Sequence, residues 1–324
     1  MLKHRILTLV LGVLAAFALS PVAPAHAATT YSGYYTNSYG TLYYEGYVPS
    51  SYHTGTAVPL VVALHGCTQT TGDFAAGTRW NTLAEQKGFI VLYVQQSYYQ
   101  NNALCWNWEE WIDQFRGQYE PSQIAGITNL VKSSYTIDPK KVFVTGISAG
   151  GAMSTIMAAT YPDLYAAASV SAGCEYDGYP CGSSGGQSPT TSGNEAYSAM
   201  GSYARSVPVL LFHGTADSIV PPINASQEVT SWAQADDKAS DGVDNNNIDD
   251  VVDATTSGTV SGGRSWTDSI YKNSTTGATV IEKYLVTGMG HAWSGGCSCG
   301  SYTDPQGPDA TTISWNFFVA HPKP

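Results

Sequence analysis

A serine flanked by glycines, in the segment Gly146-Ile147-Ser148-Ala149-Gly150, is the first candidate for chemistry. An apolar run precedes this segment and a run of small residues follows it, which predicts a sharp turn from a strand into a helix. Such a turn holds the serine in a strained conformation, and the glycines let strand and helix approach each other. The pattern therefore predicts a nucleophile. A glycine-rich helix cap is the alternative, which the flanking runs disfavour.

A serine hydroxyl is a weak nucleophile at neutral pH, so it needs a histidine base and a carboxylate that orients the base. In the chain order that accompanies this turn, the acid and then the histidine follow the serine. This order excludes His53 and His65, and His321 lies almost at the end of the chain. His291 follows an apolar run on a glycine-flanked loop and is the preferred base. His213, which ends another run, is the alternative and is expected to support a turn.

The orienting carboxylate is expected on the loop that follows the apolar run 207–214, and Asp217 lies there. The surrounding pattern, His-Gly-x-x-Asp-x-x-Val-Pro, is fairly specific. Asp217 has an alternative role as a turn or helix-cap residue. Two rival acids, Asp163 and Asp177, precede the strand after which the acid usually lies.

Acyl transfer also needs N–H donors for the oxyanion, each worth about 10²–10³-fold in rate. The N–H of Ala149, directly after the serine, is one candidate. The other is the N–H of Cys67, which follows the apolar run 59–64 on a loop of the kind that commonly supplies this donor. His65, on the same loop, is expected to be buried and to hold the loop in place.

Six short apolar runs alternate with segments of helical pattern, several of which end at Gly or Pro. The runs predict buried strands and lie at 59–66, 88–95, 140–146, 166–173, 207–214 and 280–288. Their alternation with helices predicts an α/β fold, with a mostly parallel central sheet and helices on both faces. The tyrosine-rich segment 31–52 predicts antiparallel edge strands. A single domain is expected, because the chain shows neither a Pro/Thr/Ser-rich linker nor a repeat.

The first 27 residues have the pattern of a secretory signal peptide. Lys3 and Arg5 precede an apolar stretch, and Ala25-His26-Ala27 is a small-x-small cleavage site. We therefore expect a secreted, extracellular protein whose catalytic domain spans 28–324. The apolar stretch is too short to cross a bilayer, so no membrane association is expected.

The chain is acidic, with 25 Asp and Glu against 14 Lys and Arg and a formal net charge of −11. Removal of the basic leader makes the charge more negative still. Such a charge repels nucleic acid and anionic membrane surfaces, so neither is an expected partner. We expect a monomer whose partner is its substrate.

Six cysteines lie in the exported part of the chain, and an even number there favours disulfides. We expect Cys67 to pair with Cys105 and Cys174 with Cys181. Cys297 and Cys299 remain, and such close neighbours rarely reach disulfide geometry. A zinc site at this Cys-x-Cys pair is the alternative, although a second pair of ligands is missing.

Four tryptophans lie near the candidate site residues. Trp106 and Trp108 are candidates for a substrate platform, with packing under the loop as an equal alternative. Trp111 is expected to be an ordinary structural residue. Trp293, two residues from His291, is a candidate for substrate contact, and packing against the histidine loop is the alternative.

A polar, acidic segment at about 237–263 predicts a solvated insertion loop near the rim of the site. Alignment with a calcium-binding EF-hand loop starting at Asp237 fails, because Ala239 and Ile248 occupy ligand positions. Calcium binding in another geometry stays open. We expect neither a metal nor a cofactor in the candidate site.

Together these motifs resemble the esterase family of extracellular poly(3-hydroxybutyrate) depolymerases, which is related to feruloyl and acetylxylan esterases of carbohydrate esterase family 1. The resemblance covers about 59–318 and is carried by LHGCTQT with Asp73, CWNW, GISAGGAMS, YPDLYAAASVSAG, HGTADSIVPP and GMGHAWSGG. It implies an α/β-hydrolase fold and ester hydrolysis through an acyl-Ser148 intermediate. It also implies Asp217 as the acid, His291 as the base, an oxyanion loop at Gly66 and Cys67, and no cofactor.

The resemblance favours a polyester of the poly(3-hydroxybutyrate) type, or its oligomers, as the substrate. Feruloyl or acetylated plant-wall esters are the alternative. A serine peptidase on the same fold would use the same three residues. A non-catalytic polymer-binding protein would not need Ser148, Asp217 and His291 all intact.

Overall fold

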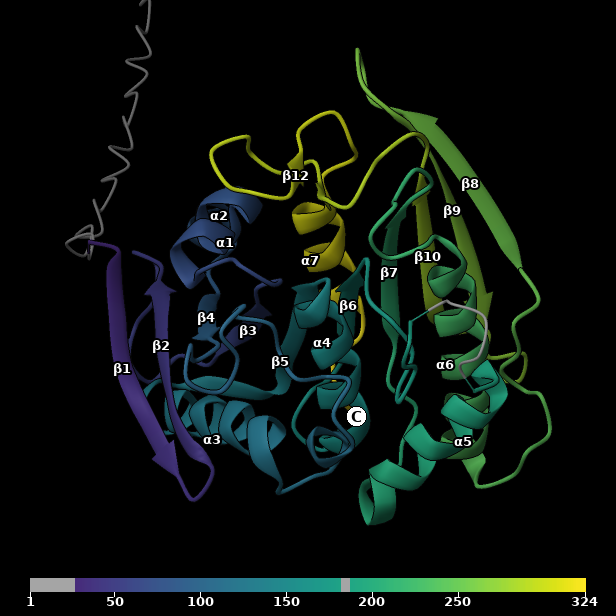
Figure 1. Cartoon of the computed structure of the whole chain (residues 1–324), viewed down its shortest axis with the longest axis horizontal. Helices are drawn as coiled ribbons and strands as arrows, with labels where there is room; N and C mark the ends of the chain where they lie inside the picture. The colour runs from purple at the N-terminus through teal and green to yellow at the C-terminus, as the bar shows by residue number, and fades with distance from the viewer. Residues whose placement is uncertain (1–26, 182–186) are drawn as a thin grey trace, which may run out of the picture.

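The computed structural model describes residues 27–181 and 187–324, so the predicted signal peptide lies, except for Ala27, outside the described residues. Among these described residues, ten strands form one sheet in the order β1-β2-β4-β3-β5-β6-β7-β10-β9-β8 (Figure 1). The strands are β1 (Thr29–Asn37), β2 (Gly40–Val48), β3 (Val58–Leu64), β4 (Ile90–Gln95), β5 (Ile137–Ile147), β6 (Ala168–Ser171), β7 (Val209–Gly214), β8 (Ala254–Thr259), β9 (Ser265–Lys272) and β10 (Thr279–Val286). Two short strands, β11 (Trp293–Ser294) and β12 (Thr303–Asp304), pair separately.

The six central strands, from β4 to β10, run parallel, and they coincide with the six apolar runs of the sequence. Antiparallel hairpins extend the sheet at both edges: β1 and β2 join β4, while β9 and β8 join β10. The predicted parallel sheet and the predicted tyrosine-rich edge strands are therefore confirmed.

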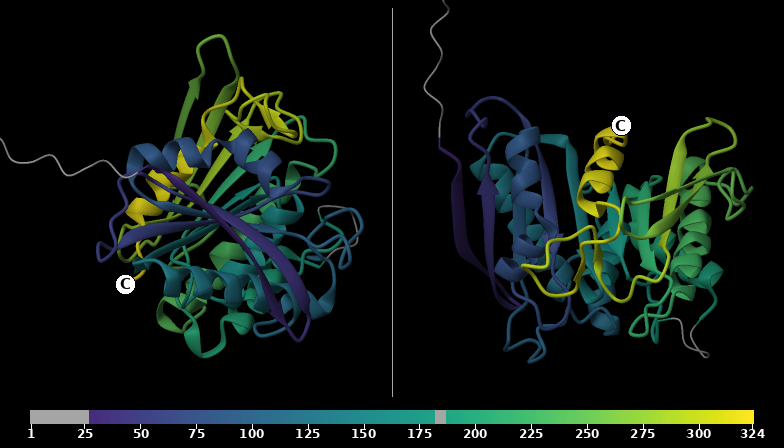
Figure 2. Two further views of the ribbon diagram at one scale, coloured as in Figure 1. Left: turned by 90° about the vertical axis from the view of Figure 1, so that its left-hand side faces the viewer. Right: turned by 90° about the horizontal axis from the view of Figure 1, so that it is seen from above.

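Within the described ranges, seven α-helices and two short 3-10 turns accompany this sheet, and helices lie on both of its faces (Figure 2). They are α1 (Thr71–Thr78), α2 (Trp80–Lys87), η1 (Trp111–Gln114), α3 (Tyr119–Ser134), α4 (Ala149–Thr160), α5 (Pro189–Met200), η2 (Gly201–Tyr203), α6 (Ile223–Asp241) and α7 (Ala310–Ala320). Every helix in the described ranges is too short or too polar to cross a membrane.

The central strands are apolar along their whole length because both of their faces are buried. On β3, Leu60 and Val62 pack into a core with α3, α4, α5 and α6. Val61 and Ala63, which point the other way, pack into a second core with α1, α2 and α7. The chain thus forms a single three-layer α/β domain, as the sequence predicts.

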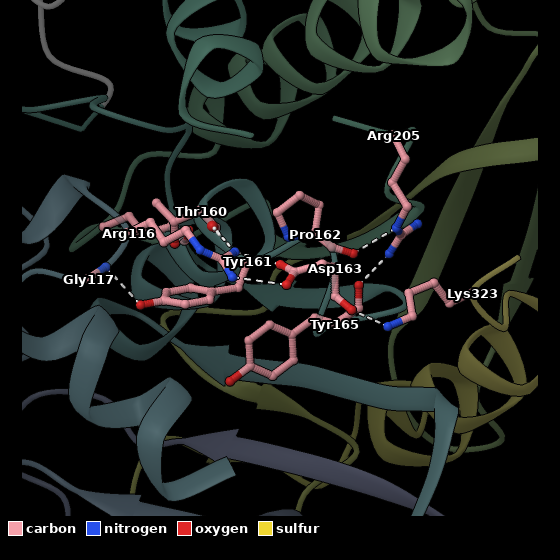
Figure 3. A network of polar contacts seen from close by, with 10 residues as sticks. Arg116, Gly117, Thr160, Tyr161, Pro162, Asp163, Tyr165, Arg205 and Lys323 are labelled. Carbon is pink, nitrogen blue, oxygen red and sulfur yellow. Dashed lines mark hydrogen bonds and ion pairs between the residues drawn. The ribbon is translucent and has the colours of Figure 1, made fainter. Parts of the chain in front are cut away.

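A network of charged side chains stabilises the carboxyl end of α4, which is the end farther from Ser148 (Figure 3). Arg116 donates from its two terminal nitrogens to both carboxylate oxygens of Asp163, at 2.6 and 2.9 Å. Arg205 donates to the carbonyl of Pro162 at 2.7 Å, and Lys323 donates to the main-chain oxygen of Asp163. The rival acid Asp163 is therefore held in an ion pair at the opposite end of the helix from the serine.

The polar segment at 237–263 is more ordered than predicted, and the expected loop bounds are wrong. Helix α6 continues to Asp241, and β8 covers Ala254–Thr259, which leaves 242–253 as a loop and 260–263 in the turn before β9. The carboxylate of Asp237 holds this loop by accepting three backbone N–H groups, those of Asn245, Asn246 and Ile248. The loop packs beside the turn that precedes β10, since Asn247 accepts from the N–H of Ser274. It therefore lies at the amino end of β10, away from His291 and not at the site rim.

All six cysteines are paired. The expected disulfides Cys67–Cys105 and Cys174–Cys181 are confirmed. Cys297 and Cys299 also form a disulfide with each other, contrary to the expectation that their closeness would prevent it. This pairing replaces the zinc alternative, because both thiols are used.

Candidate active site

Ser148 forms the turn between β5 and α4, with φ +58° and ψ −126°. Residues other than glycine rarely adopt a positive φ, and such backbone strain costs about 1–3 kcal/mol. The flanking glycines are required by close contacts. A Cβ atom on Gly146 would lie 2.2 Å from the carbonyl oxygen of Gly150, and one on Gly150 would lie 2.2 Å from that of Leu64. The predicted steric role of both glycines is confirmed.

Two neighbouring segments meet Ser148 at the carboxyl end of β5. Its N–H donates to the carbonyl of Ser171, at the end of β6, at 2.9 Å. On the other side, a Cβ atom on Gly66 would lie only 3.3 Å from the Cβ of Ser148, so the loop after β3 lies against the serine. The Ser148 hydroxyl makes no hydrogen bond among the described residues.

Asp217 and His291 are brought together from the ends of β7 and β10. Asp217 Oδ2 lies 2.7 Å from His291 Nδ1. Its other oxygen accepts the N–H groups of Ile219 and Val220, both at 2.9 Å. Burial alone would raise the pKa of the Asp217 carboxyl, but the His291 contact and the two N–H donors outweigh burial and lower that pKa. The Asp217 carboxylate therefore stays charged. Because it contacts Nδ1 of His291, the other ring nitrogen, Nε2, is left for a different partner.

The two loops pack tightly enough to fix this contact. A Cβ atom on Gly214, at the end of β7, would lie 2.2 Å from the carbonyl oxygen of Met289. The N–H of Ala216 donates to the same carbonyl at 2.9 Å. Because parallel strands end at one sheet edge, these loops share that edge with the Ser148 turn.

The other histidines have structural partners. His213 Nε2 donates to the carbonyl of Val220 at 2.9 Å, and burial lowers the pKa of its ring. Its ring supports the Asp217 turn, as the sequence predicts. The two ring nitrogens of His321 contact the carbonyls of Phe317 and Thr279.

The loop after β3, which carries His65 and Cys67, is held rigidly. His65 is buried; its Nδ1 donates to the carbonyl of Gly66 at 2.7 Å, and its Nε2 accepts the N–H of Gln96 at 3.0 Å. Burial lowers the pKa of His65 to about 4, so the ring stays neutral and fixes the loop, as predicted. The indole of Trp106 donates to the carbonyl of His65 at 3.0 Å.

The two predicted oxyanion donors lie on the segments that flank the serine. Cys67 follows Gly66 on the loop after β3, and Ala149 is the first residue of α4. Within the described ranges, neither N–H has a backbone or side-chain acceptor. The first N–H groups of a helix also carry partial positive charge, which favours an anion there. Both groups are therefore available to a negatively charged oxygen.

The aromatic predictions need correction. Trp106 and Trp293 are each 1% exposed and cannot form a substrate platform in this conformation. Trp106 supports the His65 loop, and Trp293 packs between Phe74 and Trp80. The sequence reasoning placed these residues near the site correctly but had no means of showing which way they face.

The other two tryptophans are more accessible. Trp108 is half-buried, with its ring centroid 6.3 Å from that of Tyr179, and stays a candidate for substrate contact. Trp111 was expected to be an ordinary structural residue, yet it is 68% exposed and contacts the ring of Phe115 at 4.7 Å.

Tyr302 is the residue that the sequence reasoning missed. Its ring stands edge-on to His291, with centroids 6.0 Å apart, and it is 41% exposed. The loop of the third disulfide places it there. The N–H of Cys297 donates to the carbonyl of Gly77 at 2.7 Å, and the N–H of Ser301 donates to Asp73 at 3.0 Å. The Cys-x-Cys directly after the histidine motif was the available signal for this loop.

Known proteins resemble this chain along most of its length. Residues 42–243 match the family described as esterase PHB depolymerase. The chain is 36% identical to poly(3-hydroxyalkanoate) depolymerase C of Paucimonas lemoignei, over 82% of this chain and 62% of that protein. It is 35% identical to acetylxylan esterase A of Talaromyces purpureogenus, over 62% of this chain and 55% of that protein. The match thus spans less than two thirds of either relative.

Solved structures share the fold. An acetyl xylan esterase from Aspergillus awamori superposes with a TM-score of 0.66 at 23% identity, covering 90% of this chain and 99% of that one. The feruloyl esterase module from Clostridium thermocellum gives a TM-score of 0.53 at 14% identity, with 83% of each chain covered. The fold is that of the α/β-hydrolases, and the chain belongs to the esterase PHB depolymerase family.

Proposed function

We propose that this protein is a serine carboxylic-ester hydrolase with Ser148 as nucleophile, His291 as base and Asp217 as the residue that orients the base. One observation carries the proposal: the 2.7 Å contact from Asp217 to His291 lies at the same sheet edge as the strained Ser148 turn. Family membership supports it, because the relatives named above are a depolymerase and an acetylxylan esterase.

The reaction has two steps. The Ser148 oxygen attacks the ester carbonyl while His291 Nε2 takes the hydroxyl proton, and the tetrahedral intermediate places its negative oxygen at the N–H groups of Cys67 and Ala149. Collapse of this intermediate breaks the ester bond, and His291 returns the proton to the leaving alcohol. A water molecule then attacks the acyl-serine by the same route and releases the acid.

A polyester of 3-hydroxy acids, or its oligomers, is the proposed substrate class. The relative with the longest matched segment among those described is a poly(3-hydroxyalkanoate) depolymerase, which supports this choice. Acetylated xylan is the second candidate, because an acetyl xylan esterase covers 90% of this chain in the structural superposition. Trp108 and Tyr302 are the proposed aromatic contacts for either substrate.

Secretion as a monomer is part of the proposal. The leader pattern in 1–27 and the three disulfides support export into an oxidising compartment. Mass spectrometry of protein from the culture medium tests this step. A mature amino terminus at Ala28 is expected, and intact protein retained inside the cell would contradict it.

One side-by-side assay tests the activity and the substrate. Purified protein is given a poly(3-hydroxybutyrate) suspension, acetylxylan, methyl ferulate and a peptide anilide. Loss of turbidity with the polyester, greater than acetate or ferulate release at equal enzyme concentration, is expected. Preferred release of acetate would assign the second candidate substrate, and cleavage of the anilide alone would overturn the esterase proposal. Ser148→Ala is the control and should be inactive on every ester.

A further inference from the structure

A polar groove lies between the β1–β2 hairpin and helices α1 and α2, at the edge of the sheet. Its volume is about 560 Å³, within the range of ligand pockets. In the left view of Figure 2 the purple hairpin lies beside the blue helices, and residues of both line the groove. In the strand order, β4 and β3 separate β2 from β5, which leads to Ser148. The groove is therefore distinct from the candidate active site.

Small residues on α1 leave the groove open. Gly72, Ala75 and Ala76 line the groove from α1. Ala75 and Ala76 follow Gly72 by three and four residues, so all three lie on one face of the helix. The hairpin side bears Tyr43 and Glu45, which alternate along β2 and point to the same face of the sheet.

One carboxylate and one guanidinium line the groove without pairing with each other. Oε2 of Glu45 accepts the phenol O–H of Tyr43 at 3.0 Å, which leaves Oε1 as a free acceptor among the described contacts. Arg79 uses one terminal nitrogen to donate to the carbonyl of Gly295 at 2.5 Å. The same nitrogen lies 4.0 Å from Oδ2 of Asp309, and the other N–H groups of Arg79 are donors beside the groove. Glu45 and Asp309 offset the charge of Arg79, so the groove offers strong donors and acceptors but no excess positive charge.

An oriented amide provides a further donor. Tyr93, which is 1% exposed, donates its phenol O–H to Asn81 Oδ1 at 2.8 Å. This contact fixes the amide, and Asn81 Nδ2 has no partner within the described residues. A donor fixed by a buried side chain loses little entropy when it binds a ligand.

An exposed aromatic surface continues the groove along the hairpin. Tyr34 and Tyr43 lie opposite each other on β1 and β2, with ring centroids 5.4 Å apart. Tyr34 is 74% exposed. Exposed rings of this kind bury apolar ligand faces at low entropic cost.

We propose that this groove binds a segment of a neutral polysaccharide chain. Sugar hydroxyls donate to Glu45 and accept from Arg79 and Asn81, while the C–H face of a sugar ring packs on Tyr43 and Tyr34. Phosphate-bearing ligands do not fit, because the single guanidinium is balanced by a carboxylate on an acidic protein. A polyester chain offers only acceptors along its length and leaves Glu45 without a donor.

Isothermal titration with xylohexaose tests the groove. This probe has no ester, so its binding is independent of the proposed hydrolysis. The variants are Tyr43→Ala with Glu45→Ala, and Thr82→Trp, which fills the groove from its exposed rim. Each should weaken xylohexaose binding by about tenfold or more. Tyr99→Ala, a change of a 99% exposed tyrosine elsewhere, is the matched control and should bind normally.

Hydrolysis of p-nitrophenyl acetate should be unchanged in all these variants, which separates the groove from the candidate active site. Absence of binding to the unaltered protein would overturn the proposal. Equal binding by all variants would also overturn it, since the sugar would then lie elsewhere. A linear 3-hydroxybutyrate hexamer should bind Ser148→Ala protein equally well with and without the groove changes, and loss of its binding in the groove variants would contradict the assigned ligand class.

Discussion

At the carboxyl ends of the parallel strands, the Ser148 hydroxyl and the N–H groups of Cys67 and Ala149 have no partner among the described residues. At the other end of α4, the carboxylate of Asp163 is paired with Arg116, and main-chain oxygens accept from Arg205 and Lys323. The region around Ser148 therefore keeps polar groups free to bind a ligand, whereas the region around Asp163 pairs its polar groups within the protein.

Backbone strain follows the same division. Ser148 is held at φ +58° by contacts so close that both flanking residues must be glycine. Asp237, near the amino ends, uses its carboxylate to satisfy three N–H groups of a loop. Backbone strain and unpaired N–H donors are tolerated at the first region, where a bound substrate would accept hydrogen bonds from these donors. The paired polar groups of the second region contribute to stability instead. Changes at the first region should affect activity, and changes at the second should affect stability.

The largest effect is expected from Asp217→Asn, which removes the charge that orients His291. By analogy with serine hydrolases in general, kcat should fall by about 10³–10⁴-fold. Steady-state hydrolysis of a p-nitrophenyl ester measures this loss. Asp177→Asn is the matched control at a rival acid and should retain activity. If the two variants behaved in the opposite way, the assignment of Asp217 would be wrong.

Gly150→Ala should damage the fold itself, because the new Cβ would overlap the carbonyl oxygens of Leu64 and His65. We expect the free energy of unfolding to fall by roughly 3 kcal/mol or more, or the protein not to fold. Urea unfolding measures this. Gly72→Ala is the control, since its Cβ would have its nearest neighbour 4.0 Å away. A Gly150→Ala protein of normal stability would contradict the close packing at this turn.

Asp236→Asn should change the pH dependence of stability and leave kcat unaltered. Asp236 accepts the N–H of Val207 at the amino end of β7, and burial raises its pKa to about 8. The folded protein therefore keeps this proton up to about pH 8, whereas the unfolded chain releases it near pH 4. The stability that this group contributes is present below about pH 4 and is lost as the pH rises to about 8.

The size of this effect follows from the difference between the two pKa values. The free energy of unfolding should fall by roughly 2–5 kcal/mol more in the unaltered protein than in the Asn variant between these pH values. Unfolding in urea at a series of pH values measures the difference. Asp249→Asn, at an exposed position, should keep the original profile. Parallel profiles for Asp236→Asn and the unaltered protein would show that Asp236 is ionised in the fold.

The smallest effect is expected from Tyr302→Ala, because the ring touches the site without a chemical role. Loss of the ring beside His291 should lower kcat/KM by about fivefold, mainly through KM. Tyr302→Phe should restore most of the activity, because the ring makes the contact. Trp111→Ala removes an exposed aromatic elsewhere and should have no effect. Equal losses in the Ala variants of Tyr302 and Trp111 would contradict a local role for Tyr302.

Local patterns allowed much of this fold to be predicted. The six central strands are buried on both faces and so appear as continuous apolar runs, and the glycines around Ser148 reflect contacts within a few residues. The pairing of Asp217 with His291 followed from chain order and the shared edge of parallel strands.

The failures concern packing between distant segments. Trp106 and Trp293 lie beside site motifs, but their burial depends on the His65 loop and on α1 and α2. Tyr302 reaches His291 only because a disulfide loop docks on α1. The polar composition of 237–263 hid the end of α6, whose buried face is set by Val229 and Trp232 much earlier in the helix.

The central claim is that Ser148 carries the acyl group. The most direct measurement is peptide mass spectrometry after brief incubation with p-nitrophenyl butyrate and quenching in acid. One butyryl group on the peptide that contains Ser148, with none on Ser148→Ala, is the predicted result. An acyl group trapped on a different residue, or hydrolysis by Ser148→Ala at the rate of the unaltered protein, would contradict the account.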